Sequence, residues 1–263
     1  MKKISQILLT LFTLILITGC DSDNNNDEET SEDVSINSKW IVSNSSEYES
    51  FEFNESGNYI IVKNTEEERT TDTETILFGT YNLIDASTVI LSDFGTLLIS
   101  DIDEDSINFS IALTNNPESE IEIKAYKNAE FENSTNTDLL CRTWQMETFN
   151  GENVIGTVDD LTVIFSRAGT YFVTYTSPLS ENEGGLAKWY WSNNKQTELY
   201  YSWDKGEDSD GIVKITELTP TSLIIDEDGD ISVLTPKSTY RTTTDNTSNA
   251  TDKDIIKTGL FKK

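Results

Sequence analysis

Short runs in which apolar and polar residues alternate recur along most of this chain. The segment FEFNESGNYIIV (51–62) has two such runs around a polar turn that contains Gly57, and LTVIFSRAGTYFVTY (161–175) repeats the arrangement around Gly169. Alternation with a period of two predicts strands with one buried face, and a glycine in a short polar turn predicts a hairpin. We therefore expect a chain built from antiparallel hairpins.

Further short apolar runs follow these hairpins, and no long helical periodicity interrupts them. In the first half of the chain they are ETILFGTYNLI, STVILSD, TLLISDI, SINFSIAL and EIEIKAY. Turn signals every 8–12 residues or so are typical of an antiparallel sandwich or barrel. The pattern predicts an all-β protein.

Four pairs of segments recur in the same order, at offsets between 104 and 116 residues. The pairs are Ser38-Lys39-Trp40 with Arg142-Thr143-Trp144, Phe53–Tyr59 with Phe165–Tyr171, LLISDIDEDSINF with VKITELTPTSLII, and IEIKAYK with ISVLTPK. Conserved order with slowly drifting offsets indicates duplication of one β unit. We expect two tandem small antiparallel β-barrels.

These patterns divide the chain into six parts. They are a signal peptide (1–19), an acidic tether (20–35), a first β domain (36–127), a linker (128–138), a second β domain (139–240) and a C-terminal tail (241–263). The final residues, IIKTGLFKK, are compatible with either a strand or a frayed end.

The N-terminus has the layout of a secretory signal. Lys2 and Lys3 precede the apolar run Ile7–Ile17, which is shorter than the ~20 residues that a membrane-spanning helix needs. An ordinary signal peptide that happens to contain a cysteine is the plainer interpretation. However, Ile17-Thr18-Gly19-Cys20 resembles the lipobox of bacterial lipoproteins. That resemblance implies a diacylglyceryl group on the Cys20 thiol, cleavage before Cys20, and an acyl chain such as palmitate on its new amino group.

Acidic residues and asparagines follow Cys20 directly, and such a segment has little to bury. We expect a disordered tether. The stretch resembles the export signal of surface lipoproteins in the Bacteroidota, which implies an outer-membrane protein exposed on the cell surface. In enterobacterial lipoproteins an aspartate after the cysteine favours inner-membrane retention, so a periplasm-facing location is the alternative.

Composition narrows the possible chemistry. The formal net charge of −28 argues against nucleic acid as a partner. With no histidine and only two cysteines, the chain lacks the usual Ser-His-Asp and Cys-His catalytic groups and histidine-ligated metal sites. Once Cys20 carries lipid, Cys141 has no intrachain partner, and we expect a buried apolar residue rather than a reactive thiol.

The second unit resembles the lipocalin-like domains of Bacteroidota lipoproteins. The matching residues over 139–236 are Trp144, then Phe165, Gly169 and Tyr171, then Trp189 and Trp191, then Ile215, Leu218 and Leu223. The match over 36–127 is weaker, because Gly79-Thr80-Tyr81 stands where the second unit has its tryptophans. The resemblance implies an up-and-down barrel, but it carries no agreed activity and supplies no catalytic residue.

Four aromatic residues are the best ligand-binding candidates. Trp189 and Trp191 share one strand face, and Tyr201 and Trp203 share another. Aromatic faces stack on sugar rings or line apolar pockets. Filling the interior of a small barrel is the simpler role for them.

Acid-rich segments suggest calcium or glycosidase chemistry only weakly. Asp101, Asp103 and Asp105 alternate as in the start of an EF-hand loop, but Ser106 and Ala112 replace the required glycine and glutamate. We expect solvated turns there and at 208–211 and 226–230, and no metal or cofactor. With 47 acidic residues, carboxylate pairs arise by chance, so glycan hydrolysis is the least favoured function.

Together these features predict a lipid-anchored envelope lipoprotein that binds a partner or assists an envelope protein without catalysis. The alternative is a carrier that holds a small hydrophobic ligand or glycan in a barrel. An open barrel mouth with Trp189 and Trp191 facing a cavity would favour the carrier.

Overall fold

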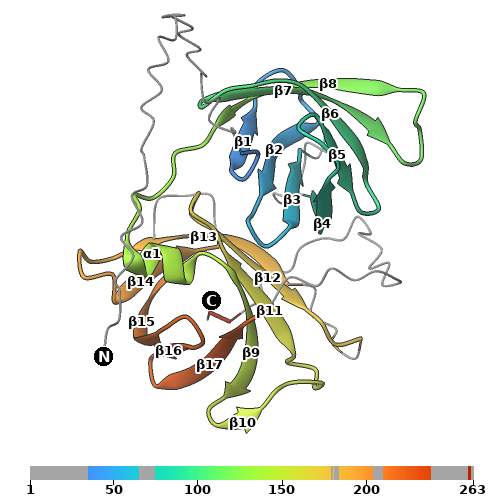
Figure 1. Ribbon diagram of the computed structural model, residues 1–263. Coiled ribbons are helices and arrows are strands. Elements are labelled where there is room, and N and C mark those ends of the chain that lie inside the picture. The colour runs from blue at the N-terminus through green and yellow to red at the C-terminus, as the bar shows by residue number, and fades with distance from the viewer. Residues whose placement is uncertain are drawn as a thin grey trace, which may run out of the picture. The chain divides into compact units, whose positions relative to one another are not determined.

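The structure is a computed structural model that describes residues 35–64, 75–178, 180, 184–203, 210–237 and 260–261. Within these ranges the chain forms two closed antiparallel β-barrels of eight strands each, which confirms the predicted fold class and the tandem arrangement (Figure 1). No helix in the described ranges is both long and apolar enough to cross a membrane. The signal peptide, Cys20 and all of the predicted tether except Ser35 lie outside the described residues.

In the first barrel the strands are arranged around the ring in the same order as in the sequence. They are β1 (Lys39–Val42), β2 (Tyr48–Phe53), β3 (Asn58–Lys63), β4 (Thr75–Leu83), β5 (Thr88–Leu91), β6 (Gly95–Ile102), β7 (Ser106–Leu113) and β8 (Glu120–Lys127). Each strand pairs with its neighbours in sequence, and β1 pairs with β8, with Ile41 opposite Tyr126. The closing pair leaves no free sheet edge.

The second barrel repeats this order after a short helix, α1 (Thr135–Leu140). Its strands are β9 (Thr143–Phe149), β11 (Leu161–Phe165), β12 (Thr170–Tyr175), β13 (Gly185–Trp191), β14 (Glu198–Ser202), β15 (Gly211–Leu218), β16 (Leu223–Glu227) and β17 (Asp230–Pro236). The two-residue strand β10 (Glu152–Asn153) extends a hairpin from β9. Pairing of β17 with β9 closes the ring.

The two hairpins predicted from sequence are present at the predicted positions. Gly57 has a φ of 75° in the β2–β3 turn, and Gly169 has a φ of 79° in the β11–β12 turn. Residues that carry a Cβ atom rarely adopt this left-handed backbone conformation, so glycine permits the tight turn. The alternating residues of β11 and β12 then pair in register, with Val163 opposite Val173.

An equivalent tryptophan anchors the start of each barrel. In the first barrel Trp40 Nε1 donates a hydrogen bond of 2.9 Å to the carbonyl oxygen of Ile36. In the second, Trp144 Nε1 donates a bond of the same length to the carbonyl oxygen of Leu140. Both indole rings are almost fully buried. The shared contact supports the duplication inferred from the sequence.

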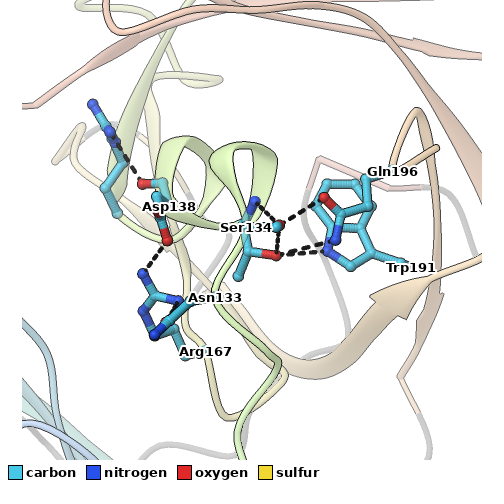
Figure 2. Close-up of polar contacts among 8 residues, drawn as sticks. Asn133, Ser134, Asp138, Arg167, Trp191 and Gln196 are labelled. Carbon is cyan, nitrogen blue, oxygen red and sulfur yellow. Dashed lines mark hydrogen bonds and ion pairs between the residues drawn. The ribbon is translucent and has the colours of Figure 1, made fainter. Parts of the chain in front are cut away.

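Helix α1 covers one end of the second barrel, and side-chain hydrogen bonds fix its position (Figure 2). The hydroxyl of Ser134 accepts a bond from the backbone N–H of Thr137, which caps the first turn. Thr137 Oγ1 in turn accepts a bond of 3.1 Å from Trp191 Nε1, while Ser134 Oγ donates to Gln196 Oε1 at 2.7 Å. The helix is thereby tied to β13 and to the turn that follows it.

The region predicted as a linker contributes to the second barrel. The ring of Phe131 packs on Trp189 with centroids 4.6 Å apart, and α1 begins at Thr135. Asp138 on the helix forms an ion pair with Arg167 from the β11–β12 turn (Figure 2). A six-residue helix is too short for helical periodicity to stand out in the sequence, which explains why the segment looked like a simple connection.

Candidate functional site

A cavity of about 260 Å³ opens at the end of the second barrel away from α1. Strand β9 begins beside α1 at Thr143 and reaches the cavity at Met146 and Phe149; β11 begins at the cavity with Leu161 and returns toward α1. The apolar lining is Met146, Phe149, Leu161, Tyr175, Ile225, Leu260 and Phe261. One end of this barrel is therefore covered, and the other is hollow.

The polar lining of the cavity is acidic. It consists of Asp159, Glu227, Asp230 and Ser232, and none of the lining residues in the described part of the chain is basic. Among the three carboxylates only Glu227 is buried, so the cavity does not bring two buried carboxylates together.

Glu227 is a buried acidic group of the cavity lining. It is 7 % exposed, and its Oε1 accepts a hydrogen bond of 2.6 Å from the hydroxyl of Tyr201. It comes just before the β16–β17 turn, where Asp228 and Gly229 have positive φ angles, as a two-residue hairpin requires. The turn expected at 226–230 is present, but one of its acids is directed inward. Burial, and then the Glu227 carboxylate, raise the pKa of the Tyr201 phenol well above its ordinary value.

Tyr201 and Trp203 pack in the barrel core with two further aromatic rings, Tyr171 and Phe261, and neither Tyr201 nor Trp203 lines the cavity. The Tyr201 ring stacks on Phe261 with centroids 4.7 Å apart, and Trp203 meets Tyr171 edge-on at 5.5 Å. All four belong to the buried core of the barrel. Trp203 Nε1 is buried and has no hydrogen-bond partner among the described residues.

Trp189 and Trp191 lie at the covered end. Trp189 is 1 % exposed, packs edge-on against Trp191 at 5.3 Å, and donates its Nε1 hydrogen to the carbonyl oxygen of Ser166. Trp191 is bound to α1 through Thr137. Neither tryptophan lines the cavity. All four candidate aromatic residues therefore pack in the core of the barrel, where Trp189 pairs with Tyr201 across β13 and β14, and none of them lines the cavity.

Sequence reasoning missed the residues that define the cavity. Phe261 lies in an isolated Leu-Phe pair, and Glu227 lies in an acidic run that resembles an exposed turn. The one available signal was the apolar character of IIKTGLFKK, which follows a long polar stretch.

The DIDEDSIN segment forms a turn between β6 and β7. Asp103 accepts hydrogen bonds from the backbone N–H groups of Asp105 and Ser106 and from the Ser106 hydroxyl. These bonds stabilise the ionised carboxylate and lower the pKa of Asp103. Within the described ranges no three His, Cys, Asp or Glu side chains are grouped so that they could hold a metal ion.

Comparison with known proteins adds no family assignment. No protein-family model matches the chain, and no curated protein is similar to it in sequence.

The Tyr201–Glu227 hydrogen bond is tested by Tyr201→Phe, with Tyr200→Phe on the opposite face of β14 as the matched control. Loss of a hydrogen bond to a charged acceptor should lower the free energy of unfolding by about 1.5–3 kcal/mol. Because the folded pKa of Tyr201 is raised, its contribution is complete below pH 10 and declines as the unfolded chain ionises above that pH.

Urea unfolding at pH 8 and pH 11, followed by tryptophan fluorescence, measures both effects. Tyr201→Phe should be less stable than the wild type at pH 8 and should lose less stability between the two pH values. Equal alkaline losses in the wild type and in Tyr201→Phe would contradict the assignment.

Cys141 should behave as an unreactive thiol. Burial raises its pKa to about 12, and the nearby Arg167 guanidinium only partly opposes this rise. In a Cys20→Ser variant, which leaves Cys141 as the sole thiol, a disulfide reagent at pH 8 should react about a thousandfold more slowly with the folded protein than with the urea-unfolded protein. Similar rates in both states would show that Cys141 is accessible.

Proposed function

We propose that this protein is a non-enzymatic binding protein of the cell envelope, held to a membrane by lipid on Cys20, whose second barrel receives a small apolar ligand. The observation that carries the proposal is the cavity at the open end of that barrel. It combines an apolar and aromatic wall with a few inward polar groups, which is the usual composition of a small-molecule site.

The size of the cavity limits what enters it. Its volume of about 260 Å³ lies just below the ~300–1,000 Å³ of typical ligand pockets. A single ring system, or one apolar arm of a larger molecule, fits such a space. The apolar wall favours this class over a glycan, whose hydroxyl groups would need more hydrogen-bond partners than the cavity offers.

The charges of the cavity select against anions. Asp159, Glu227 and Asp230 surround the opening without a basic neighbour in the lining, and the whole chain carries a formal charge of −28. A carboxylate or sulfonate would lose hydration and meet like charge there. The favoured ligand is a neutral or cationic molecule whose hydrogen-bond donor faces the acids.

The N-terminal sequence supplies the proposed location. A lipobox-like ITGC followed by acids supports anchoring to the outer membrane with the barrels on the cell surface, and a periplasm-facing anchor is the alternative. Several acyl chains would give a durable attachment.

A second candidate function is accessory binding to an envelope protein. The observation that favours it is a set of large apolar side chains that are at least two-fifths exposed on β4, β5 and β6 and next to β4: Leu83, Ile84, Ile90 and Leu98. This function and ligand binding are compatible, because they use different barrels.

Ligand binding is tested with two probes that share one ring system. N-phenyl-1-naphthylamine is neutral and has one N–H donor, whereas 8-anilinonaphthalene-1-sulfonate adds a negative charge. Two like charges about 4 Å apart repel by about 1 kcal/mol in water and about 4 kcal/mol near a protein surface. Since about 1.4 kcal/mol corresponds to a tenfold change in the dissociation constant, we expect the neutral probe to bind at least about tenfold more tightly. Fluorescence titration measures both dissociation constants.

The position of the site is tested by filling the cavity. Met146→Trp should abolish binding of N-phenyl-1-naphthylamine, while Ile155→Trp, at a side chain that is 49 % exposed, should leave it unchanged. Circular dichroism establishes that both variants fold. Unchanged probe binding in folded Met146→Trp would place the ligand elsewhere.

Membrane anchoring is tested by Cys20→Ser in the full chain. The variant should move from the membrane fraction to the soluble fraction, because no thiol remains to accept lipid at this position. Continued membrane association after high-salt washing would contradict the proposed anchor. Protease treatment of intact cells then distinguishes surface exposure from a periplasm-facing location.

A further inference from the structure

The segment Leu260–Phe261 lies inside the second barrel. Figure 1 shows it as a short red trace beside the label C, within the ring of strands. Phe261 is only 3 % exposed and stacks on Tyr171 and Tyr201, with ring centroids 4.5 and 4.7 Å away and interplanar angles of 17° and 28°. The ring is thus held between two parallel aromatic faces.

The backbone of this segment is also bound. The N–H of Leu260 donates a hydrogen bond of 3.0 Å to the hydroxyl of Tyr171. The barrel thus holds a backbone N–H together with the aromatic side chain of the residue that directly follows it. The barrel therefore recognises both a ring and its adjoining backbone.

Leu260–Phe261 is an occupant of the barrel rather than part of its wall. The ring of strands closes through the β9–β17 pairing, and the segment belongs to none of its strands. Twenty-two residues separate it from Lys237, the last described residue after β17. Closure of the sheet does not require it.

Within the described ranges, no comparable segment from outside the strands packs between two tyrosine rings in the first barrel. Leu91 pairs with Gly95 in that barrel, as Tyr201 pairs with Gly211 in the second. Tyr59, the sequence equivalent of Tyr171, donates its hydroxyl to the carbonyl oxygen of Ser92 in its own barrel at 2.6 Å. The second barrel instead presents two tyrosines to a ring that comes from outside the sheet.

The occupant and the cavity share one space. Leu260 and Phe261 form part of the cavity lining, together with Met146 and Ile225 of the barrel wall. A ligand that penetrates beyond the present cavity must take the place of the Phe261 ring. Displacement would expose the Tyr171 and Tyr201 faces to that ligand.

We infer that Leu260–Phe261 is an intramolecular competitor for the ligand site of the second barrel, and that the site takes aromatic ligands that stack between Tyr171 and Tyr201. This inference rests on the proposed ligand-binding function. Because competitor and site share one chain, binding of the segment is independent of protein concentration. The apparent dissociation constant for a ligand is the intrinsic value divided by the fraction of molecules whose site is free.

The full-length variant Phe261→Ala tests the inference, with N-phenyl-1-naphthylamine as the ligand and Tyr126→Ala, an exposed aromatic truncation in the first barrel, as the control. If the segment occupies the site nine-tenths of the time, Phe261→Ala should lower the dissociation constant about tenfold. Tyr126→Ala should match the wild type. A synthetic peptide with the sequence of residues 252–263 should displace the probe from Phe261→Ala, and the same peptide with alanine at position 261 should not.

A second variant separates competition from loss of folding. Leu260→Pro retains the Phe261 ring but removes the N–H that bonds Tyr171, so it should tighten probe binding by a smaller factor. If Phe261→Ala does not fold, Leu260→Pro decides the question, and the peptide is added to Leu260→Pro instead.

Different results would contradict the competing role of Leu260–Phe261 and the ligand site itself. Equal probe affinity in the wild type, Phe261→Ala and Leu260→Pro, with Met146→Trp still abolishing binding, would overturn the competitor and leave the ligand site intact. Absence of probe binding in every folded variant would overturn both.

Discussion

An eight-stranded barrel has an interior that its own side chains must fill, and this constraint governs both halves of the protein. The first barrel meets it with residues such as Phe51, Ile61 and Ile111, all of which come from its strands. The second barrel uses Trp144 and Trp189 among others, and its core also includes Phe261, which does not come from a strand. One end of this barrel keeps a cavity, and Phe261 forms part of its lining.

Local patterns were sufficient to predict the hairpins, because a hairpin is defined by neighbouring residues. The alternation in 51–62 and 161–175 and the glycines at 57 and 169 correspond directly to β2–β3 and β11–β12. The closing pairs β1–β8 and β9–β17 join residues some 80 to 90 positions apart, and no local signal marks them. The duplicated tryptophans at 40 and 144 supplied the missing information, since two similar units of about 100 residues each need their own closed sheet.

The candidate site was only half visible in the sequence. Tyr201 and Trp203 stood out because aromatic residues alternate on β14 and just after it, and the structure stacks Tyr201 on Phe261 and packs Trp203 against Tyr201 and Tyr171. Trp189 and Trp191 gave the same signal, but Trp191 is hydrogen-bonded to Thr137 of α1 and Trp189, which pairs with Tyr201 across β13 and β14, packs against Phe131 and Trp191 instead. Alternation identifies the face of a strand, whereas position along the barrel depends on topology.

The negative charge of the protein has a specific consequence at the open end of the second barrel. Dispersed over a surface, negative charge mainly maintains solubility. In the apolar cavity that we propose as a ligand site, Asp159, Glu227 and Asp230 would also select among amphiphiles, because the lining offers no basic group to a negative head group. If Cys20 holds the chain at a membrane, apolar molecules reach the cavity at high local concentration, so intrinsic affinity need not be high. Under those conditions selectivity between ligands would matter more than affinity for any one ligand. Both the competing Phe261 ring and the acidic residues of the cavity would contribute to that selectivity.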